Sequence, residues 1–209
     1  EAMGQGVPAT ASAAAPAAPL ASPRSAEVAD LLTRIDREHR PACQHIVREG
    51  VRRLIDYQDP AYAALYLDRL ALLSARADAV DDTLMRETAR HLALWMSYED
   101  TIRVADLKTR DSRFERVQGE VRAKADQQVH INEFMHPRIE EVCETLPAAL
   151  GRWLAQPHAV HRLVARWTRE GRVVRTSSLR GFLLLWLLSR WRVARRSTLR
   201  YALENERIE

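Results

Sequence analysis

Apolar residues recur every three to four positions through almost the whole sequence from Ser25 onward, and this spacing places them on one face of an α-helix. Helix-start signals stand in front of several of these runs, at Ser25, Asp59-Pro60 and Asp81-Asp82. Only 7 of the 209 residues are glycine, although sheet-rich and nucleotide-binding folds usually need more for their tight turns. The sequence therefore predicts an all-α fold with at most one short strand or hairpin.

The longest helix is expected over residues 82–125, where Asp81-Asp82 provides the start signal. Its first half is apolar on a broad face, whereas its second half narrows to a single apolar stripe. A narrowing stripe indicates a helix that leaves the core and projects toward solvent or a partner. We therefore expect an irregular multi-helix domain with one long helix.

Shorter elements are expected after this helix. Gln128–Phe134 alternates enough to predict one short strand, and residues 171–178 predict a basic turn or a small hairpin. Ser177 or Ser178 begins a helix whose centre, Phe182–Leu188, is apolar on all sides, so this helix is expected to be buried. Three prolines each precede a short helix, namely Pro137, Pro147 and Pro157.

Residues 1–24 are rich in alanine and proline and contain few large apolar side chains. Prolines oppose a helix, and this composition cannot form a core. We expect this segment to be a linker from a missing N-terminal domain, followed by one helical domain over residues 25–209. No signal peptide or membrane-spanning run is recognisable, and the two isolated cysteines fit a reducing compartment, so a cytoplasmic location without membrane contact is expected.

The net charge of +4 is unevenly distributed. Residues 171–209, the Arg-rich end, contain nine Arg against three Glu, or +6, so the other residues carry about −2. A basic end on a near-neutral body suggests an acidic partner surface, nucleic acid or an anionic ligand. No helix-turn-helix, zinc or RNA-binding signature accompanies the arginines, and upstream acids could pair with them, so nucleic acid is disfavoured.

Patterns of the common catalytic and cofactor sites are missing from the sequence. Gly4–Ala9 matches the spacing G-x-G-x-x-A, but it lacks the preceding strand and following helix that dinucleotide binding requires. His158 and His161 stand at i, i+3 without a recognisable third ligand, so surface or packed histidines are the better interpretation. The two cysteines are too few for an iron–sulfur cluster, which needs about four thiolates. We predict no catalytic, cofactor-binding or metal-binding residue in this chain.

The richest polar segment lies in the middle of the expected long helix. It contains acid–base pairs at i, i+4 in the favourable order, as in Glu99–Arg103, which a solvated helix face would also show. Asp100 and Asp111, however, fall on the apolar line, where a carboxylate needs a donor such as Arg113, Arg116 or a base of the Arg-rich end. Because acids and bases neutralise one another here, we predict an interaction surface rather than a catalytic site. This predicted surface comprises Tyr98, Glu99, Asp100, Arg103, Asp106, Lys108 and Arg110.

Three segments carry a resemblance to a known family. They are residues 56–69 (DYQDPAYAALYLDR), 96–110 (MSYEDTIRVADLKTR) and 133–152 (EFMHPRIEEVCETLPAALGR). In this order they resemble the C-terminal helical region of the beta subunit of indolepyruvate ferredoxin oxidoreductases, which belong to the 2-oxoacid:ferredoxin oxidoreductase superfamily. The stretch TSSLRGFL at 176–183 is also similar, and the resemblance spans roughly residues 26–207.

This resemblance implies an accessory role within a larger enzyme. The family's enzymes oxidatively decarboxylate aryl pyruvates to aryl-acetyl-CoA and reduce ferredoxin, with thiamine diphosphate and iron–sulfur clusters mainly in the alpha subunit. The chain would dock the alpha subunit or cover the active site, beside an N-terminal α/β domain of its own polypeptide and with ferredoxin as an indirect partner. No residue matches a family catalytic motif. The alternative is an independent helical module that binds an acidic partner or nucleic acid through the Arg-rich end.

Overall fold

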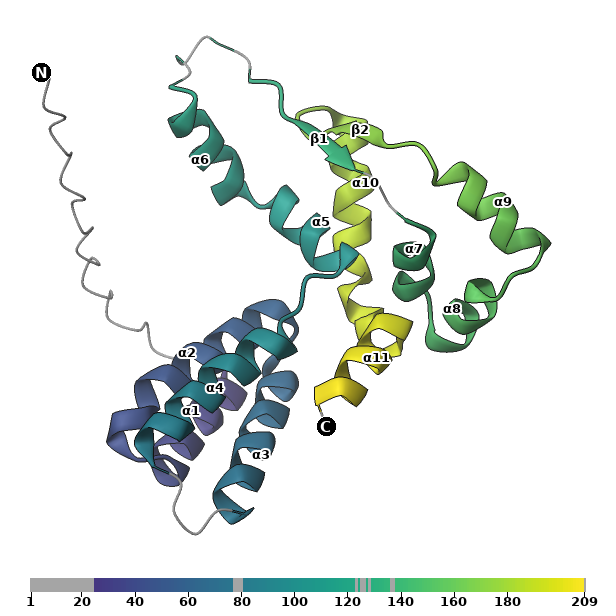
Figure 1. Cartoon of the computed structure of the whole chain (residues 1–209). Helices are drawn as coiled ribbons and strands as arrows, with labels where there is room; N and C mark the ends of the chain where they lie inside the picture. The colour runs from purple at the N-terminus through teal and green to yellow at the C-terminus, as the bar shows by residue number, and fades with distance from the viewer. Residues whose placement is uncertain are drawn as a thin grey trace, which may run out of the picture.

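The computed structural model confirms the all-α fold, in which the helices are accompanied by one small sheet (Figure 1). The expected linker over residues 1–24, and with it the Gly4–Ala9 motif, lies outside the residues that the structure describes. The described residues are 25–76, 81–122, 124, 127, 129–135 and 138–208.

The first four helices form a bundle, seen at the lower left of Figure 1. Three of their starts are capped by the side chains that the sequence singled out. The Ser25 hydroxyl and the carboxylates of Asp59 and Asp81 each accept a hydrogen bond from a backbone N–H three residues later. The helices are α1 (Ala26–Glu38), α2 (Pro41–Tyr57), α3 (Pro60–Arg76) and α4 (Asp82–Met96).

The hydrophobic core lies inside this bundle and includes buried tyrosines. The Tyr62 hydroxyl donates to the carbonyl of Met96 and the Tyr66 hydroxyl to that of Ala89, each at 3.0 Å, so neither buried group lacks a partner. Gly50 on α2 makes room for the second of these rings, because a Cβ atom there would lie 2.6 Å from the Tyr66 hydroxyl oxygen. Aliphatic side chains fill the remaining core, namely Ile35, Val47, Val51, Leu54, Leu67 and Leu70.

The prediction of a single long helix over residues 82–125 is wrong. This segment forms three helices, α4, α5 (Thr101–Thr109) and α6 (Asp111–Glu120). At the first break, the Ser97 hydroxyl donates back to the Ala93 carbonyl at 2.7 Å and ends α4. The Asp100 carboxylate then accepts from the backbone N–H of Arg103 at 2.6 Å and starts α5. Serine and aspartate side chains compete with helix continuation in this way. The expected projection holds for α6, none of whose described residues is buried.

The second half of the chain is arranged around the packed pair α5 and α10. The prolines at 147 and 157 precede short helices as expected, and Ser178 caps α10 by accepting from the Gly181 N–H. The last helix, α11, returns to contact α4, α7 and α8. The remaining helices are α7 (Ile139–Thr145), α8 (Ala148–Ala155), α9 (Ala159–Trp167), α10 (Leu179–Arg190), the 3-10 helix η1 (Trp191–Ser197) and α11 (Leu199–Ile208).

A two-stranded antiparallel sheet joins segments that are distant in sequence. Strand β1 (Asn132–Met135) pairs with β2 (Arg172–Arg175), with Asn132 opposite Arg175. The expected strand is therefore present from Asn132 onward, whereas Gln128 lies outside the described residues. The prediction of a hairpin within residues 171–178 is wrong. Strand β2 pairs with the distant strand β1, and Ser178 already caps α10.

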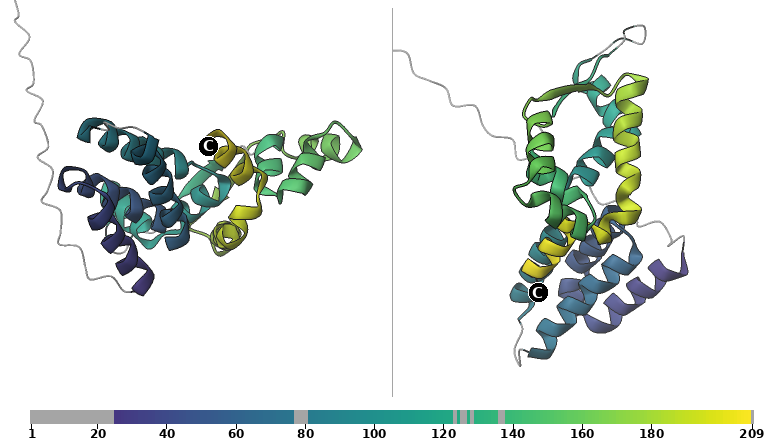
Figure 2. Two further views of the ribbon diagram at one scale, coloured as in Figure 1. Left: turned by 90° about the horizontal axis from the view of Figure 1, so that it is seen from below. Right: turned by 90° about the vertical axis from the view of Figure 1, so that its right-hand side faces the viewer.

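The expectation that α10 is buried on all sides is also wrong. Leu185 is only 1% exposed, whereas Leu179 and Leu187 are 73% and 61% exposed, and α10 packs against α5. The right-hand view of Figure 2 shows α10 along one edge of the molecule, with its neighbours on one side. Among the described residues, no helix combines the length and apolar character needed to cross a membrane.

Candidate functional site

The most deeply buried charges of the described residues form an ion pair between α5 and η1. The side chains of Arg195 and Asp100 are 1% and 7% exposed. Arg195 donates through Nε to Asp100 Oδ2 at 2.7 Å and through Nη2 to Asp100 Oδ1 at 3.1 Å. This two-point contact fixes the planes of both groups. The donor expected for Asp100 is thus a base of the Arg-rich end.

The same arginine and its neighbour Arg192 complete the C-terminal end of α2. Arg195 Nη1 donates to the carbonyl of Tyr57 at 2.6 Å, and Arg192 donates to the carbonyls of Ile55 and Gln58, each at 2.9 Å. These carbonyls have no partner inside the helix, and a helix C-terminus favours positive charge. Burial and the nearby charge of Arg195 lower the pKa of the Arg192 guanidinium below its ordinary value.

Aromatic rings enclose the buried pair. The Arg195 guanidinium lies 4.2 Å from the centre of the Tyr57 ring, and Tyr98 meets that ring edge-on at 5.6 Å. The Tyr57 hydroxyl donates to Asp100 Oδ2 at 3.4 Å. Burial raises the pKa of both tyrosines well above the ordinary value, so their hydroxyls stay neutral. The ion pair is therefore sheltered from water on this side.

A second, more exposed cluster of charges joins α2 to α5. Arg103 pairs with Asp56 at 2.7 Å and with Asp106 at 3.0 Å, and Arg110 pairs with the same carboxylates at 3.0 and 2.6 Å. Burial alone would raise the pKa of the Asp56 carboxyl, but hydrogen bonds from Arg103 and Arg110 outweigh it and hold the pKa below its ordinary value. The two acids and two bases neutralise one another.

A third contact ties the sheet to α5 and α6. Glu133 on β1 has a side chain only 8% exposed and forms ion pairs with Lys108 and Arg113. One carboxylate thus receives cations from two helices, and this interaction fixes the position of β1 relative to them.

The structure brings six of the seven residues of the predicted interaction surface into contacts within the chain. Glu99 is the exception, since it is exposed and lines a pocket. The sequence reasoning missed Asp56 and Glu133 as partners, because local spacing carries no signal for contacts between separate elements. The six residues with internal contacts are Tyr98, Asp100, Arg103, Asp106, Lys108 and Arg110.

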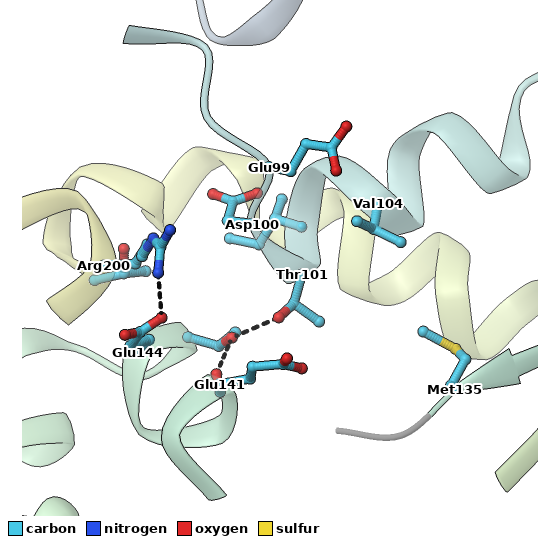
Figure 3. Close-up of a pocket in the computed structure, with 11 residues that line it drawn as sticks. Glu99, Asp100, Thr101, Val104, Met135, Glu141, Glu144 and Arg200 are labelled. Atoms are coloured by element: carbon cyan, nitrogen blue, oxygen red, sulfur yellow. Dashed lines mark hydrogen bonds and ion pairs between the residues drawn. The ribbon is translucent and has the colours of Figure 1, made fainter. Parts of the chain in front are cut away.

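A pocket of about 370 Å³ lies beside the buried pair, between α5, α7 and α11 (Figure 3). Its charged lining residues are four acids, namely Glu99, Asp100, Glu141 and Glu144, and one base, Arg200, which pairs with Glu144 at 2.8 Å. The lining contains no histidine, cysteine or lysine. Within the described ranges, no three side chains of metal-binding type are grouped so as to hold an ion. The pocket therefore offers carboxylates and threonine hydroxyls beside a single guanidinium group.

A larger cleft of about 710 Å³ runs between α2, α4 and α5 and is lined by five arginines together with Glu49 and Asp56. Four of these arginines form ion pairs, for example Arg52 with Glu49 at 2.8 Å. The remaining one, Arg53, donates to the Ser97 hydroxyl. Because most of its positive charge is compensated, the cleft has little charge left for an anionic ligand.

The histidines weighed as metal ligands make contacts with the backbone. His158 Nδ1 accepts from the His161 N–H at 3.2 Å and caps α9, while its Nε2 donates to the Trp153 carbonyl at 2.9 Å. His161 Nδ1 donates to the Leu154 carbonyl at 2.9 Å. Both imidazole rings thus stabilise the connection between α8 and α9 through hydrogen bonds to the backbone.

Comparison with known proteins gives one match. The sequence model described as "Family of unknown function (DUF6537)" matches residues 43–209. No curated protein and no solved structure matches the chain. The matched region contains every residue of the buried pair, of the charge cluster around Asp56 and of the contacts of Glu133.

Proposed function

For this chain, which belongs to the family of unknown function DUF6537, we propose the role of an accessory helical domain of an indolepyruvate ferredoxin oxidoreductase beta subunit. The whole complex would oxidatively decarboxylate aryl pyruvates to aryl-acetyl-CoA in the cytoplasm and reduce ferredoxin. This domain would bind the alpha subunit and take no part in the chemistry itself.

The observation that carries the proposal is the internal compensation of the charged groups. Asp100, Asp56 and Glu133 each contact guanidinium or ammonium groups of other elements, so these acids hold the helices together. A general base needs a free lone pair that faces a substrate, and these carboxylates point at cations of the same chain. An arrangement of this kind suits a rigid docking domain.

The assignment to this oxidoreductase is supported by the three resembling segments. Two of them, residues 56–69 and 96–110, are joined in the structure by the ion pairs of Asp56 with Arg103 and Arg110. The resemblance thus includes residues that form the framework of the domain. On this proposal, the alpha subunit holds thiamine diphosphate and the iron–sulfur clusters, and an α/β domain of the same polypeptide lies beside this one.

Deletion of the domain from the complete enzyme tests the proposal. The beta subunit, with and without residues 25–209, is produced together with the alpha subunit and analysed by native mass spectrometry. We expect the deletion to abolish or weaken the complex and to lower indolepyruvate-dependent reduction of ferredoxin. Unchanged assembly and turnover would refute an accessory role.

The alternative role, a module that binds nucleic acid or an acidic partner through the whole Arg-rich end, receives no support from a specific observation. Arg192 donates hydrogen bonds to the C-terminal end of α2, and Arg195 pairs with Asp100. Arg196 pairs with Asp59 at 2.7 Å, and Arg200 pairs with Glu144. Half of the eight arginines between residues 171 and 203 therefore have partners within the fold.

A further inference from the structure

The solvent-facing side of α10 carries two parallel rows of large apolar side chains. One row runs through Leu184 and Leu187 and continues to Trp191, the first residue of η1, and the other runs through Leu179, Leu183 and Trp186. Residues spaced by three and four positions lie one above the other on a helix. The rows therefore form one continuous strip along the helix.

This strip is open to solvent on the side away from α5. The exposed fractions of its side chains range from 42% for Leu183 and Trp186 to 73% for Leu179. Figure 1 shows α5 beside α10, and the turned view in Figure 2 shows no ribbon over the opposite side. Continuous apolar surface of this kind is rare on monomeric proteins and marks interaction sites.

Arginines stand at the two ends of the strip. Arg180 begins the row that leads to Trp191, and Arg190 ends the row that starts at Leu179. Both are exposed, and neither forms an ion pair with a described carboxylate; Arg190 only stacks on Trp186 at 5.9 Å. No Asp or Glu occurs between residues 171 and 203, so this face has no acid of its own.

We infer that this face of α10 is the docking surface for the alpha subunit, and that the subunit offers an apolar groove with a carboxylate near each end. The inference rests on the proposed function and specifies the chemistry of the partner. Arg180 and Arg190 are ten residues apart, or about 15 Å along a helix, which sets the distance between the two carboxylates. Such charges fix the register of a helix in a groove.

The position of the charges favours a protein groove over a membrane surface. A helix that lies on a membrane carries its basic residues along the polar flank, parallel to the apolar strip. Here the unpaired arginines stand at opposite corners of the strip, which suits a partner of finite length.

Substitutions on the strip test the inference in the full-length beta subunit. The double variant Leu184→Ser/Leu187→Ser removes the centre of the strip, and Arg180→Glu/Arg190→Glu reverses the end charges. Leu72→Ser is the matched control for the first, because Leu72 on α3 is 56% exposed against 57% for Leu184. Arg152→Glu, at an exposed position on α8, is the control for the second. Affinity for the alpha subunit, the melting temperature and binding to anionic vesicles and to RNA are measured for each.

We expect each double variant to weaken binding to the alpha subunit at least tenfold without lowering the melting temperature, while the controls bind as wild type does. The charge reversal should have less effect at high salt. If the wild-type complex forms and both double variants bind the alpha subunit as tightly as the wild type does, the assignment of the docking surface is wrong, whereas the proposed function stands. If wild type binds no alpha subunit, the proposed function is wrong and this inference with it. Strip-dependent binding to vesicles or RNA in place of the subunit would overturn the assignment of the partner.

Discussion

Replacing Asp100 with alanine removes two stabilising contacts at once. The carboxylate caps α5 by accepting from the Arg103 N–H at 2.6 Å, and it neutralises Arg195, whose side chain is only 1% exposed. In the variant, the guanidinium keeps its bonds to the Tyr57 carbonyl and to Gln58 but stays buried as an uncompensated charge.

The loss of folding stability in Asp100→Ala can be estimated from these two lost contacts. An N-cap side chain contributes about 1 kcal/mol, and breaking a buried ion pair by removing one partner costs about 3–5 kcal/mol. The sum of roughly 4–6 kcal/mol is a large part of the stability of a domain, which is about 5–15 kcal/mol. At roughly 2–4 °C per kcal/mol for a chain of this size, Asp100→Ala should lower the melting temperature by roughly 10–20 °C.

Calorimetry with a matched control distinguishes this effect from loss of any carboxylate. Asp56→Ala is the control, because Asp56 also pairs with arginines but its side chain is 46% exposed, and exposed pairs contribute at most about 1 kcal/mol. Adding Arg195→Met to Asp100→Ala should recover part of the loss, since an apolar side chain replaces the orphaned charge. If Asp100→Ala and Asp56→Ala melt within about 3 °C of each other, the reasoning about burial is refuted.

Three further predictions follow from single features of the fold. Gly50→Ala should destabilise the bundle by about 1–3 kcal/mol, because its Cβ would lie 2.6 Å from the Tyr66 hydroxyl, whereas Gly119→Ala on α6, with nothing within 4 Å, should stabilise by about 0.5–1 kcal/mol; urea unfolding of both variants checks this, and equal effects would contradict it. The lowered pKa of Asp56 stabilises the fold at pH values above its ordinary pKa of 3.8, and this stabilisation is lost as the pH falls. The melting temperature of Asp56→Asn should therefore depend less on pH between about 5 and 3 than that of the wild type, and an equal dependence would count against this. Burial raises the pKa of all five tyrosines, that of Tyr62 to about 12, so their stabilising effect is complete below the ordinary value of 10.0 and declines above it. Tyrosinate absorbance should therefore lag behind that of the unfolded chain above pH 10.0 and rise together with unfolding, and free titration in the folded state would oppose this.

Local chemistry accounts for the features that the sequence predicted well. Ser25, Asp59, Asp81 and Ser178 each cap the helix that their position indicates, because a cap acts within three residues. The same chemistry explains the error over residues 82–125. The spacing places Asp100 on the apolar line of a continuous helix, but aspartate is also a capping residue, and in the structure its capping interaction ends the continuity of the helix.

Local sequence patterns do not predict features that depend on contacts between distant elements. The sequence indicated that Asp100 needs a donor, but Arg195 is one of several arginines in the Arg-rich end, and only the packing of η1 on α2 selects it. The burial of α10 was predicted wrongly for a related reason. An all-apolar helix must be covered, but the pattern cannot tell whether a neighbour in the same fold or another protein covers it.

The buried pair also sets an order of events during synthesis of the protein. Arg195 is made 95 residues after Asp100 and 138 residues after Tyr57, to whose carbonyl it donates a hydrogen bond. At about 5–20 residues per second, the carboxylate leaves the ribosome roughly 5–20 s before its partner. During this interval the bundle of α1 to α4 can form, whereas the end of α2 and the start of α5 still lack their cation. The nascent chain should therefore pass through a partly folded stage that ends only when η1 emerges.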